Sequence, residues 1–282
     1  MDLTYPKIIK ELLSKYETRP SKGLGQNFLI DKNVLEKIIK VSEIKKTDTV
    51  LEVGPGMGVL TQKLAEKARR IVAVEKDETM IEVLKETVND FNNIEVISED
   101  ILQIDLAQYT KKPYKVIANI PYYLTSPLIR KFLESKNQPE EMVLMLQKEV
   151  AQRICSKPPE MSLLAVSVQY YAKAKIEFYV SKNCFWPAPK IDSAIIKITP
   201  NRKFDKIESD SFFEIVKAGF SHPRKQLIGN LSKKLKLNKQ QTGKWLEDNG
   251  IGSNQRAETL GIIDWTNLTK SFGKLELDQM GD

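Results

Sequence analysis

Short apolar runs recur along the first 200 residues and are separated by segments with helical spacing. The main runs cover residues 49–53, 71–74, 94–97, 116–118 and 142–146. Apolar runs of this length predict strands that are buried on both faces of a sheet. Strands that alternate with helices predict a parallel sheet wound with right-handed crossovers. A short amphipathic helix is expected before them, within residues 4–17.

The pattern changes near residue 200. Two β-rich runs, at about residues 175–180 and 193–198, would add edge strands, for example as an antiparallel hairpin. The stretch Pro200-Asn201-Arg202-Lys203 ends the second run, and only helical patterns follow it. The sequence therefore predicts an α/β domain over residues 1–200 and a small all-helical domain over residues 201–282.

Helix signals in the second half are local. Ser211 and Glu214 have the spacing of a capping box and precede Ile215 and Val216, which predicts a helix N-terminus there. Further helices are expected in the charged segment that ends at Leu246 and in the run that begins at Asp264.

Composition restricts the chemistry. With 41% hydrophobic and 29% charged residues, the 282-residue chain has an ordinary globular composition. The two cysteines and the single histidine, His222, cannot assemble a Cys/His zinc site, and no Gly-x-Ser-x-Gly motif is present. No metal is therefore expected. The N-terminus has no apolar core of a signal peptide and no apolar stretch reaches about 20 residues, so we expect a cytoplasmic protein without a membrane partner.

The net charge of +7 is unevenly distributed. Between Ile215 and Lys244 the chain has only basic charges and no carboxylate. A solvated helical face is the plainer interpretation. A span of this length without a compensating acid favours a surface that binds a polyanion. The candidate RNA-binding residues are Lys217, Arg224, Lys225, Lys233, Lys234 and Lys236, and Lys239 and Lys244 complete the span.

Three successive expected strands end in groups that suit a nucleoside ligand. The turn Gly54-Pro55-Gly56-Met57-Gly58 follows the first strand, Glu75 ends the second and Asp100 follows the third. Glycines allow close approach to the backbone, and carboxylates accept hydrogen bonds from ribose hydroxyls. Helix caps or turn residues are the alternative interpretation of both carboxylates. Val59 stands where the dinucleotide fingerprint requires glycine or alanine, which favours S-adenosylmethionine over NAD.

A second motif, Asn119-Ile120-Pro121-Tyr122, follows the fourth expected strand and suits an adenine base. The amino group of adenine is a poor nucleophile because its lone pair is delocalised into the ring. Hydrogen bonds from its two N–H groups to the Asn119 side-chain oxygen and the Ile120 carbonyl would localise that pair. Pro121 disfavours a helical Ile120, and Tyr122 can stack on the base. A simple Asn-x-Pro turn is the alternative.

Taken together, these motifs resemble the ribosomal RNA adenine dimethyltransferase family that modifies the small ribosomal subunit. The resemblance covers nearly the whole chain and includes three further stretches in family order: Gly25-Gln26-Asn27-Phe28-Leu29-Ile30-Asp31, Phe185-Trp186-Pro187-Ala188-Pro189-Lys190-Ile191-Asp192-Ser193 and Arg256-Ala257-Glu258-Thr259-Leu260. It implies a Rossmann-like S-adenosylmethionine-dependent methyltransferase sheet with a small helical domain. The implied reaction is dimethylation of two adjacent adenosines in the 3′-terminal hairpin of small-subunit RNA, within an assembling subunit.

The resemblance also implies roles for individual residues. S-adenosylmethionine would contact Gln26, Asn27, Leu29, Gly54, Gly56, Glu75, Asp100 and Asn119. The target base would be held by Asn119, Ile120, Pro121, Tyr122 and Phe185, with Phe185 on the opposite face from Tyr122. The enzyme is expected to be a monomer. Tyr123 stands where many members have asparagine, and Ala188 interrupts a triple-proline stretch, so both could alter the shape of the pocket.

Three alternatives remain open. The related large-subunit rRNA adenine methylase of macrolide resistance shares the glycine turn and the Asn-x-Pro-Tyr motif, but residues 220–227 and 256–258 look like the small-subunit group. A non-catalytic RNA-binding assembly or transcription factor on the same scaffold is disfavoured by the intact Asn119, Pro121 and Tyr122. An NAD-dependent oxidoreductase is disfavoured by Val59 and by the lack of a histidine placed for hydride chemistry.

Overall fold

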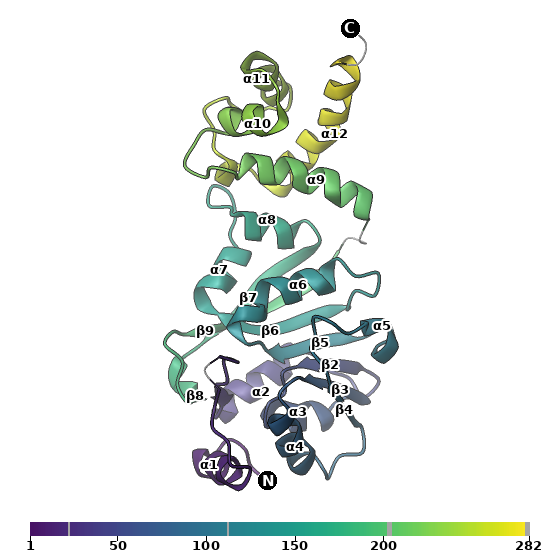
Figure 1. The fold of residues 1–282 in the computed structure, drawn as a ribbon, viewed down its shortest axis with the longest axis vertical. Helices are drawn as coiled ribbons and strands as arrows, with labels where there is room; N and C mark the ends of the chain where they lie inside the picture. The colour runs from purple at the N-terminus through teal and green to yellow at the C-terminus, as the bar shows by residue number, and fades with distance from the viewer. Residues whose placement is uncertain (22, 112, 202–204, 280–282) are drawn as a thin grey trace. The chain divides into compact units, whose positions relative to one another are not determined.

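The computed structural model describes residues 1–279 apart from residues 22, 112 and 202–204. The chain forms two compact units (Figure 1), Met1–Ala151 with Lys173–Asn201 and Gln152–Ala172 with Arg202–Asp282. Arg202 and Lys203 of the expected boundary turn lie outside the described residues. The sequence pattern did not indicate that residues 152–172 leave the sheet and join the C-terminal unit. The assignment of separate functions on either side of residue 200 stays a prediction.

The first unit is built on a wound sheet whose strands have the order β4-β3-β2-β5-β6-β9-β7 among the described residues. Neighbouring strands from β4 to β6 are parallel, and β9 is antiparallel to β6. The predicted α/β fold and all five predicted central strands are confirmed. The strands are β2 (Thr49–Val53), β3 (Arg70–Glu75), β4 (Ile94–Ser98), β5 (Lys115–Asn119), β6 (Glu141–Gln147), β7 (Ala172–Val180) and β9 (Ser193–Pro200).

The expectation of two edge strands is wrong for β9. This strand lies between β6 and β7, so that only β7 is at the edge. Its first four residues, from Ser193 to Ile196, are all buried, whereas most of β7 is partly or fully exposed. A strand with a partner on both sides lies inside the sheet, which agrees with the burial of Ala194, Ile195, Ile196 and Ile198.

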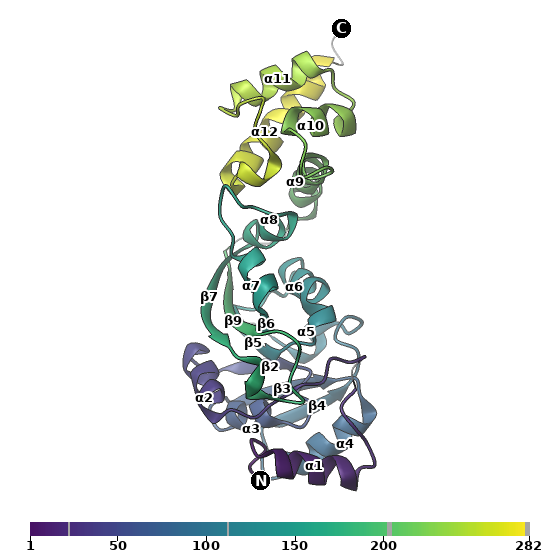
Figure 2. The same ribbon diagram turned by 90° about the vertical axis from the view of Figure 1, so that its left-hand side faces the viewer.

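Helices cover both faces of this sheet. Leu35, Leu60 and Leu84, from three successive helices, share one buried cluster with the sheet residues Val50 and Ile71. Because the strand order reverses between β2 and β5, right-handed crossovers bring the later helices to the other face. Figure 2 shows α2 and α6 on opposite sides of the sheet. The helices of this part of the chain are α1 (Pro6–Lys15), α2 (Lys32–Val41), α3 (Val59–Ala65), α4 (Glu78–Thr87), α5 (Leu106–Tyr109), α6 (Thr125–Leu133) and α7 (Lys148–Ile154).

Four short elements complete the region. Strands β1 (Phe28–Leu29) and β8 (Phe185–Trp186) pair antiparallel, with Leu29 opposite Phe185. Single turns of 3-10 helix follow Pro121 and Ser181. The pairing of β1 with β8 joins two of the stretches that carry the family resemblance, although they are far apart in the sequence.

The second unit is helical. It contains α8 (Leu163–Gln169), α9 (Lys206–Gly219), α10 (Leu227–Leu235), α11 (Lys239–Asp248) and α12 (Ile262–Gln279). The ring of Tyr170, directly after α8, stacks on Phe212 of α9 with 4.0 Å between the ring centroids. The Met161 N–H donates to the Glu258 carbonyl at 2.9 Å. These contacts explain why residues 152–172 belong to this unit.

The predicted start of α9 is wrong. The helix begins at Lys206, and the side chain of Asp205 accepts a hydrogen bond from the Glu208 N–H at 2.9 Å. Ser211 therefore lies in the helix interior. Asp205 and Glu208 have the same three-residue spacing as Ser211 and Glu214, and aspartate is an equally good N-cap, so the pattern alone did not distinguish the two positions.

Candidate functional site

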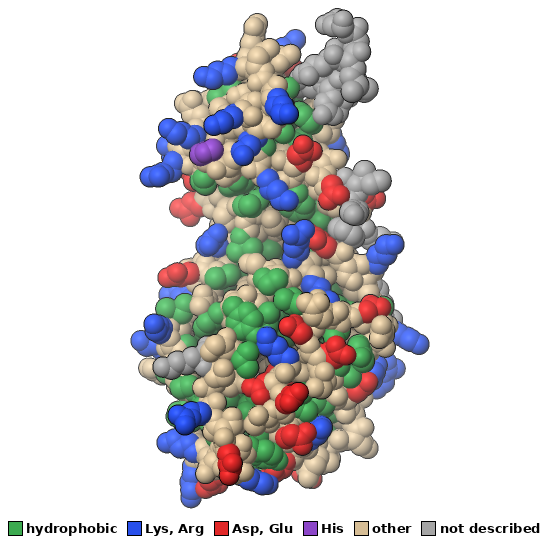
Figure 3. All heavy atoms as spheres, viewed as in Figure 1, with side chains coloured by type: hydrophobic (Ala, Val, Ile, Leu, Met, Phe, Trp, Pro, Cys, Tyr) green, Lys and Arg blue, Asp and Glu red, His purple; other side chains and the backbone are tan. Residues whose placement is uncertain are grey.

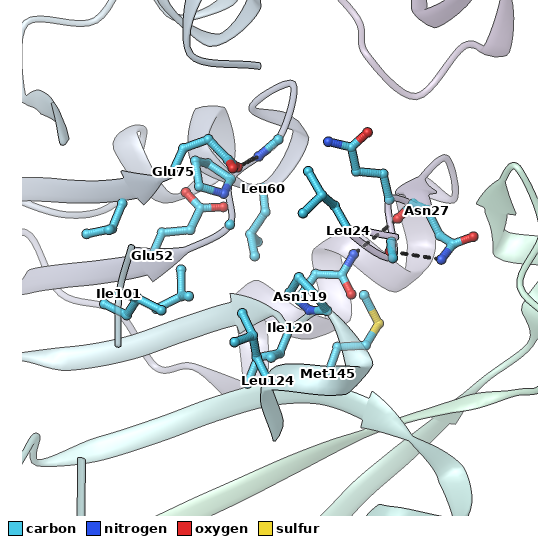
Figure 4. Close-up of a pocket in the computed structure, with 18 of the residues that line it drawn as sticks. Leu24, Asn27, Glu52, Leu60, Glu75, Ile101, Asn119, Ile120, Leu124 and Met145 are labelled. Carbon is cyan, nitrogen blue, oxygen red and sulfur yellow. Dashed lines mark hydrogen bonds between the residues drawn. The ribbon is translucent and has the colours of Figure 1, made fainter. Parts of the chain in front are cut away.

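A pocket opens where the strand order reverses, at the carboxyl ends of β2 and β5. The empty space inside it, including open solvent at its mouth, is about 1080 Å³. Figure 4 shows residues from several strand ends and from the Leu24–Asn27 loop around it. The structure brings together every residue predicted for the donor and for the base: Gln26, Asn27, Leu29, Gly54, Gly56, Glu75, Asp100, Asn119, Ile120, Pro121, Tyr122 and Phe185.

The glycine turn after β2 has a backbone that few other residues adopt. Gly54, Gly56 and Gly58 have φ values of +64°, +55° and +90°. A Cβ on Gly58 would lie 2.8 Å from Leu84 Cδ1, so this glycine allows α3 to begin in contact with α4. A Cβ on Gly54 would lie 3.6 Å from Pro121 Cδ. The glycine turn and the Asn-x-Pro-Tyr turn are therefore in close proximity.

Glu75 ends β3 and is nearly buried. Its Oε2 accepts from the Gly56 N–H at 3.2 Å, and its Oε1 accepts from the N–H groups of Lys76 and Asp77 at 2.9 and 3.0 Å. Burial nevertheless raises the pKa of Glu75. The cap of α4 is Asp77 and not Glu75. A carboxylate has about four acceptor positions, so Glu75 keeps capacity for a ligand hydroxyl while it fixes the glycine turn.

Asp100 has a partly structural role. Its Oδ1 accepts from the Leu102 N–H at 2.9 Å and closes the turn after β4. Its Oδ2 lies 3.9 Å from Lys76 Nζ. Asp100 is thus a turn residue through Oδ1, as the alternative interpretation expected. Its Oδ2 is at the wall of the pocket, where it can accept a hydrogen bond from a ligand.

Glu52, in the middle of β2, is a site residue that the sequence reasoning missed. It lines the pocket with an exposed fraction of only 2%. Its Oε2 has no hydrogen-bond partner among the described residues. Burial, with a smaller contribution from the nearby Glu75 carboxylate, raises the pKa of Glu52 to about 8. Figure 4 shows the two carboxyl groups side by side. A charged residue inside a run predicted to be buried on both faces was the available signal.

The Asn-x-Pro-Tyr turn lines the pocket and contains the two oxygens proposed to accept from the adenine amine. Asn119 donates through Nδ2 to the Asn27 carbonyl at 3.4 Å (Figure 4), which leaves Oδ1 as a free acceptor. The Ile120 N–H donates to the Met145 carbonyl at 3.3 Å. No donor among the described residues bonds to the Ile120 carbonyl. Neither of these acceptors is therefore bonded to a donor in the part of the chain that the structure describes.

Aromatic side chains form part of the same pocket. The Tyr122 hydroxyl is 3.1 Å from Ser193 Oγ, and burial raises the pKa of Tyr122. Phe185 is buried against this cavity, where β8 pairs with β1. The sequence reasoning gave Ser193 no role. Its position at the start of β9 fixes the Tyr122 ring through a contact that only the fold creates.

Gln26 has both polar side-chain atoms paired with protein. Its Nε2 donates to Asp77 Oδ2 at 2.8 Å, and its Oε1 accepts from the Ser21 N–H at 2.8 Å. Gln26 thus connects the loop before β1 to the N-terminus of α4. Its contribution to the site in this structure is to hold that loop at the wall of the pocket.

The predicted RNA-binding residues all lie in the second unit. Lys217, Arg224, Lys225, Lys233, Lys234 and Lys236 are exposed. None of them forms an ion pair with another described residue. Asn230 is buried and donates to the carbonyls of Gly219 and His222 at 2.7 and 3.0 Å, which holds the loop that carries Arg224 and Lys225. Figure 3 shows Lys and Arg side chains spread over this face of the C-terminal unit.

A wound sheet with a nucleoside-type pocket at the reversal of strand order is the fold and site of a Rossmann-like methyltransferase. The model of the ribosomal RNA adenine dimethylase family matches residues 18–274, and the chain belongs to this family. Membership makes the protein an S-adenosylmethionine-dependent rRNA adenine dimethyltransferase. None of the described helices has the length and apolar character needed to cross a membrane.

Individual relatives agree with the family assignment. The chain is 43% identical over 275 residues to the ribosomal RNA small subunit methyltransferase A of Alkaliphilus metalliredigens, covering 94% of this chain and 96% of that protein. It is 39% identical over 269 residues to the enzyme of the same name from Clostridioides difficile, covering 92% and 93%. Among solved structures, a dimethyladenosine transferase from Plasmodium falciparum is similar with a TM-score of 0.76 and 28% identity, covering 88% of this chain and 98% of that one. The 23S rRNA methyltransferase ErmE is similar with a TM-score of 0.71 and 25% identity, covering 86% and 98%.

Proposed function

We propose that this protein dimethylates the exocyclic amines of two adjacent adenosines in the 3′-terminal hairpin of small-subunit rRNA during assembly of the subunit. The observation that carries the proposal is the pair of free acceptors, Asn119 Oδ1 and the Ile120 carbonyl, beside a pocket walled by buried carboxyl groups. An amine with two N–H groups fits the two acceptors. A cationic nucleoside donor fits the pocket with its buried carboxyl groups.

The residues at the strand ends fit S-adenosylmethionine. Glu52 Oε2 is buried in the pocket without a partner among the described residues and suits an ammonium group. Glu75 and Asp100 keep oxygens for ribose and base contacts, and Gly54 and Gly56 allow the ligand to approach the backbone. When bound, the donor supplies a methyl group on an electron-poor sulfur. The chain supplies its binding, its orientation and the shielding of the site from water.

The Asn-x-Pro-Tyr turn holds and activates the acceptor. Asn119 Oδ1 and the Ile120 carbonyl accept hydrogen bonds from the adenine amine, which localises its lone pair toward the pocket. Tyr122 stacks on the base, and Ser193 fixes the Tyr122 ring. Phe185 covers the second face of the base. The first transfer replaces one N–H of the amine by N–CH₃ and releases one proton, so one N–H remains to hydrogen-bond. A second transfer, from a second donor molecule, replaces that N–H in the same way and completes dimethylation.

The relatives support the small subunit as substrate. Relatives named as small-subunit methyltransferases are 39–43% identical to this chain over nearly its full length. The solved 23S rRNA methyltransferase is 25% identical. The basic loop and helices of the second unit, from Lys217 to Lys244, would bind the phosphate backbone of the subunit. A monomer that works in the cytoplasm on assembling subunits is consistent with this substrate.

The activity can be tested on small subunits purified from a strain that lacks this methylation. The wild-type protein should transfer labelled methyl groups to them and should produce a primer-extension stop in the 3′-terminal hairpin. Asn119→Ala should suppress transfer far more than subunit binding, because the basic residues are untouched. Asn183→Ala, an exposed asparagine outside the pocket, is the matched control. Near-normal dimethylation by Asn119→Ala would contradict the acceptor site.

The large-subunit alternative has its own test. Expression of a 23S rRNA adenine methylase should reduce the macrolide susceptibility of the host, whereas the proposed activity should not change it. A macrolide-resistant phenotype that requires Asn119 would replace the small subunit by the large one as substrate.

A further inference from the structure

Two consecutive tyrosines of the Asn-x-Pro-Tyr turn have opposite environments. Tyr122 is partly buried and bonded to Ser193 inside the pocket. Tyr123 lines the same pocket but has an exposed fraction of 48%. An aromatic ring that keeps so much of its surface in water at the mouth of a ligand site has no stabilising role in the core. What distinguishes Tyr123 from other exposed tyrosines is its place in the pocket lining, where its ring is accessible to a ligand.

Lys76 contacts this ring. Its ammonium lies 5.3 Å from the centroid of the Tyr123 ring, and the Tyr123 hydroxyl and Asp100 both help to raise the pKa of Lys76. Lys76 directly follows β3, whereas Tyr123 follows β5, and these two strands flank β2. The pair thus lies across the carboxyl end of β2, at the mouth of the pocket. One aromatic face and one permanent cation are combined there.

We propose that Tyr123 and Lys76 form a docking site for the nucleotide next to the one whose base is held at Tyr122. The Tyr123 ring stacks on the neighbouring base, and the Lys76 ammonium contacts the adjoining phosphate. This inference rests on the proposed function, because it assumes a nucleic-acid substrate.

The chemistry of an extruded base favours this assignment. When a base leaves its stack for a pocket, the base beside it loses a stacking partner and exposes an aromatic face. Consecutive Cα atoms are about 3.8 Å apart, so two consecutive tyrosines are close enough to receive two consecutive nucleotides. Sites that bind single-stranded nucleic acid commonly combine an aromatic ring, which stacks on a base, with a cationic side chain, which contacts a phosphate.

The donor is the competing occupant, since Asp100 and Lys76 also face its side of the pocket. The two possibilities differ in what the loss of the ring affects. Stacking on RNA affects the affinity for subunits and for a dinucleotide. Stacking on the donor affects the affinity for S-adenosylmethionine.

The experiment compares Tyr123→Ala with Tyr123→Phe and with the control Tyr5→Ala. Tyr5 is also exposed and also has a lysine ammonium, that of Lys32, 4.8 Å from its ring centroid, but it does not line the pocket. Tyr123→Ala should raise KM for subunits roughly 5- to 150-fold, with an unchanged Kd for S-adenosylmethionine. The KM values of Tyr123→Phe and Tyr5→Ala for subunits should remain within about twofold of the wild-type value, because both variants keep an aromatic ring at position 123.

A second measurement does not depend on turnover. The wild type should bind the dinucleotide ApA more tightly than AMP, and Tyr123→Ala should lose this gain. An unchanged KM and an unchanged dinucleotide gain in Tyr123→Ala would overturn the proposal, and so would a loss confined to S-adenosylmethionine affinity. A wild type that gains nothing from the second nucleotide would also overturn it. Failure of the wild type to methylate small subunits would instead refute the proposed function, while the dinucleotide comparison would still decide the role of Tyr123.

Discussion

The Tyr122 hydroxyl lies 3.1 Å from Ser193 Oγ, although 71 residues separate them. Ser193 is the first residue of β9 and is fully buried, and β9 pairs with β6 beside the Asn-x-Pro-Tyr turn. The ring that is proposed to stack on the target base is therefore fixed at both ends, by its backbone after β5 and by its hydroxyl on β9.

Loss of this hydrogen bond should reduce turnover without affecting the donor. Tyr122→Phe and Ser193→Ala should each lower kcat on small subunits by about 2- to 10-fold, the value of one net hydrogen bond of about 0.5–1.5 kcal/mol. Tyr122→Ala should cost more because it also removes the stacking surface. Calorimetric titration should show the same S-adenosylmethionine affinity in all three variants. A kcat for Tyr122→Phe equal to that of the wild type would show that the hydroxyl contact is dispensable.

Glu75→Gln should weaken S-adenosylmethionine binding. The glutamine amide has one acceptor oxygen, whereas the carboxylate has two, so a ribose hydroxyl loses its acceptor. The expected cost is roughly 1–3 kcal/mol, or about 5- to 150-fold in Kd. Glu78→Gln, an exposed glutamate in the first turn of α4, should bind as the wild type does. Titration with NAD should give no binding to either protein. Clear NAD binding without S-adenosylmethionine binding would contradict the donor assignment.

Glu52 should make stability fall with rising pH. Its pKa is raised from 4.5 to about 8 in the folded protein, so the folded state holds a proton that the unfolded chain has already released. The free energy of unfolding should therefore decrease as pH rises across this window, by up to about 1.4 kcal/mol per pH unit. Glu52→Gln should lose this dependence, and its stability relative to the wild type should increase from about pH 6 to about pH 8 in denaturant titrations. Parallel pH profiles of the free energy of unfolding would mean that the pKa of Glu52 is not raised by folding.

The basic loop of the second unit should contribute phosphate contacts. Replacing Arg224 and Lys225 together by glutamine should raise KM for subunits and flatten its log–log salt dependence by about 0.7–0.9 per lost contact. S-adenosylmethionine affinity should not change. The control replaces Lys45 and Lys67, two exposed lysines of the first unit, in the same way. An unchanged KM and salt slope in the Arg224/Lys225 variant would favour a merely solvated face.

Asn230→Ala tests the position of that loop without changing its charge. The substitution leaves the carbonyls of Gly219 and His222 without their donor, which should cost about 1–3 kcal/mol of stability and raise KM for subunits. Asn249 also donates to a backbone carbonyl and to a side chain in this unit, at Trp245 and Ser271. Asn249→Ala should destabilise the protein similarly but leave KM unchanged. If both variants raised KM equally, the effect would come from general destabilisation of the unit and not from the position of the loop.

Much of the site was determined by local sequence. The glycines at positions 54, 56 and 58 predict a turn that a ligand can approach closely, and all three adopt positive φ values that favour glycine. Glu75 and Asp100 follow strands whose apolar runs are unambiguous, and parallel strands align their carboxyl ends on one edge. Because these signals depend only on neighbours in the chain and on the sheet geometry, the place of the pocket and its strand-end residues could be predicted. Apolar lining residues such as Leu60 and Met145, and the buried Glu52, were not predicted.

Tertiary structure decided what depends on distant partners. The position of β9 between β6 and β7 follows from pairing along the strand, and the short β-rich run at residues 193–198 does not specify its neighbours. Residues 152–172 join the helical unit because Tyr170 stacks on Phe212, a contact between residues far apart in the sequence. The buried Glu52 Oε2, which has no hydrogen-bond partner among the described residues, and the Tyr122–Ser193 contact likewise exist only after folding. Burial and pairing are properties of the assembled core. The sequence therefore indicated many residues of this site, but not the burial and raised pKa of Glu52 or the hydrogen bond that holds Tyr122.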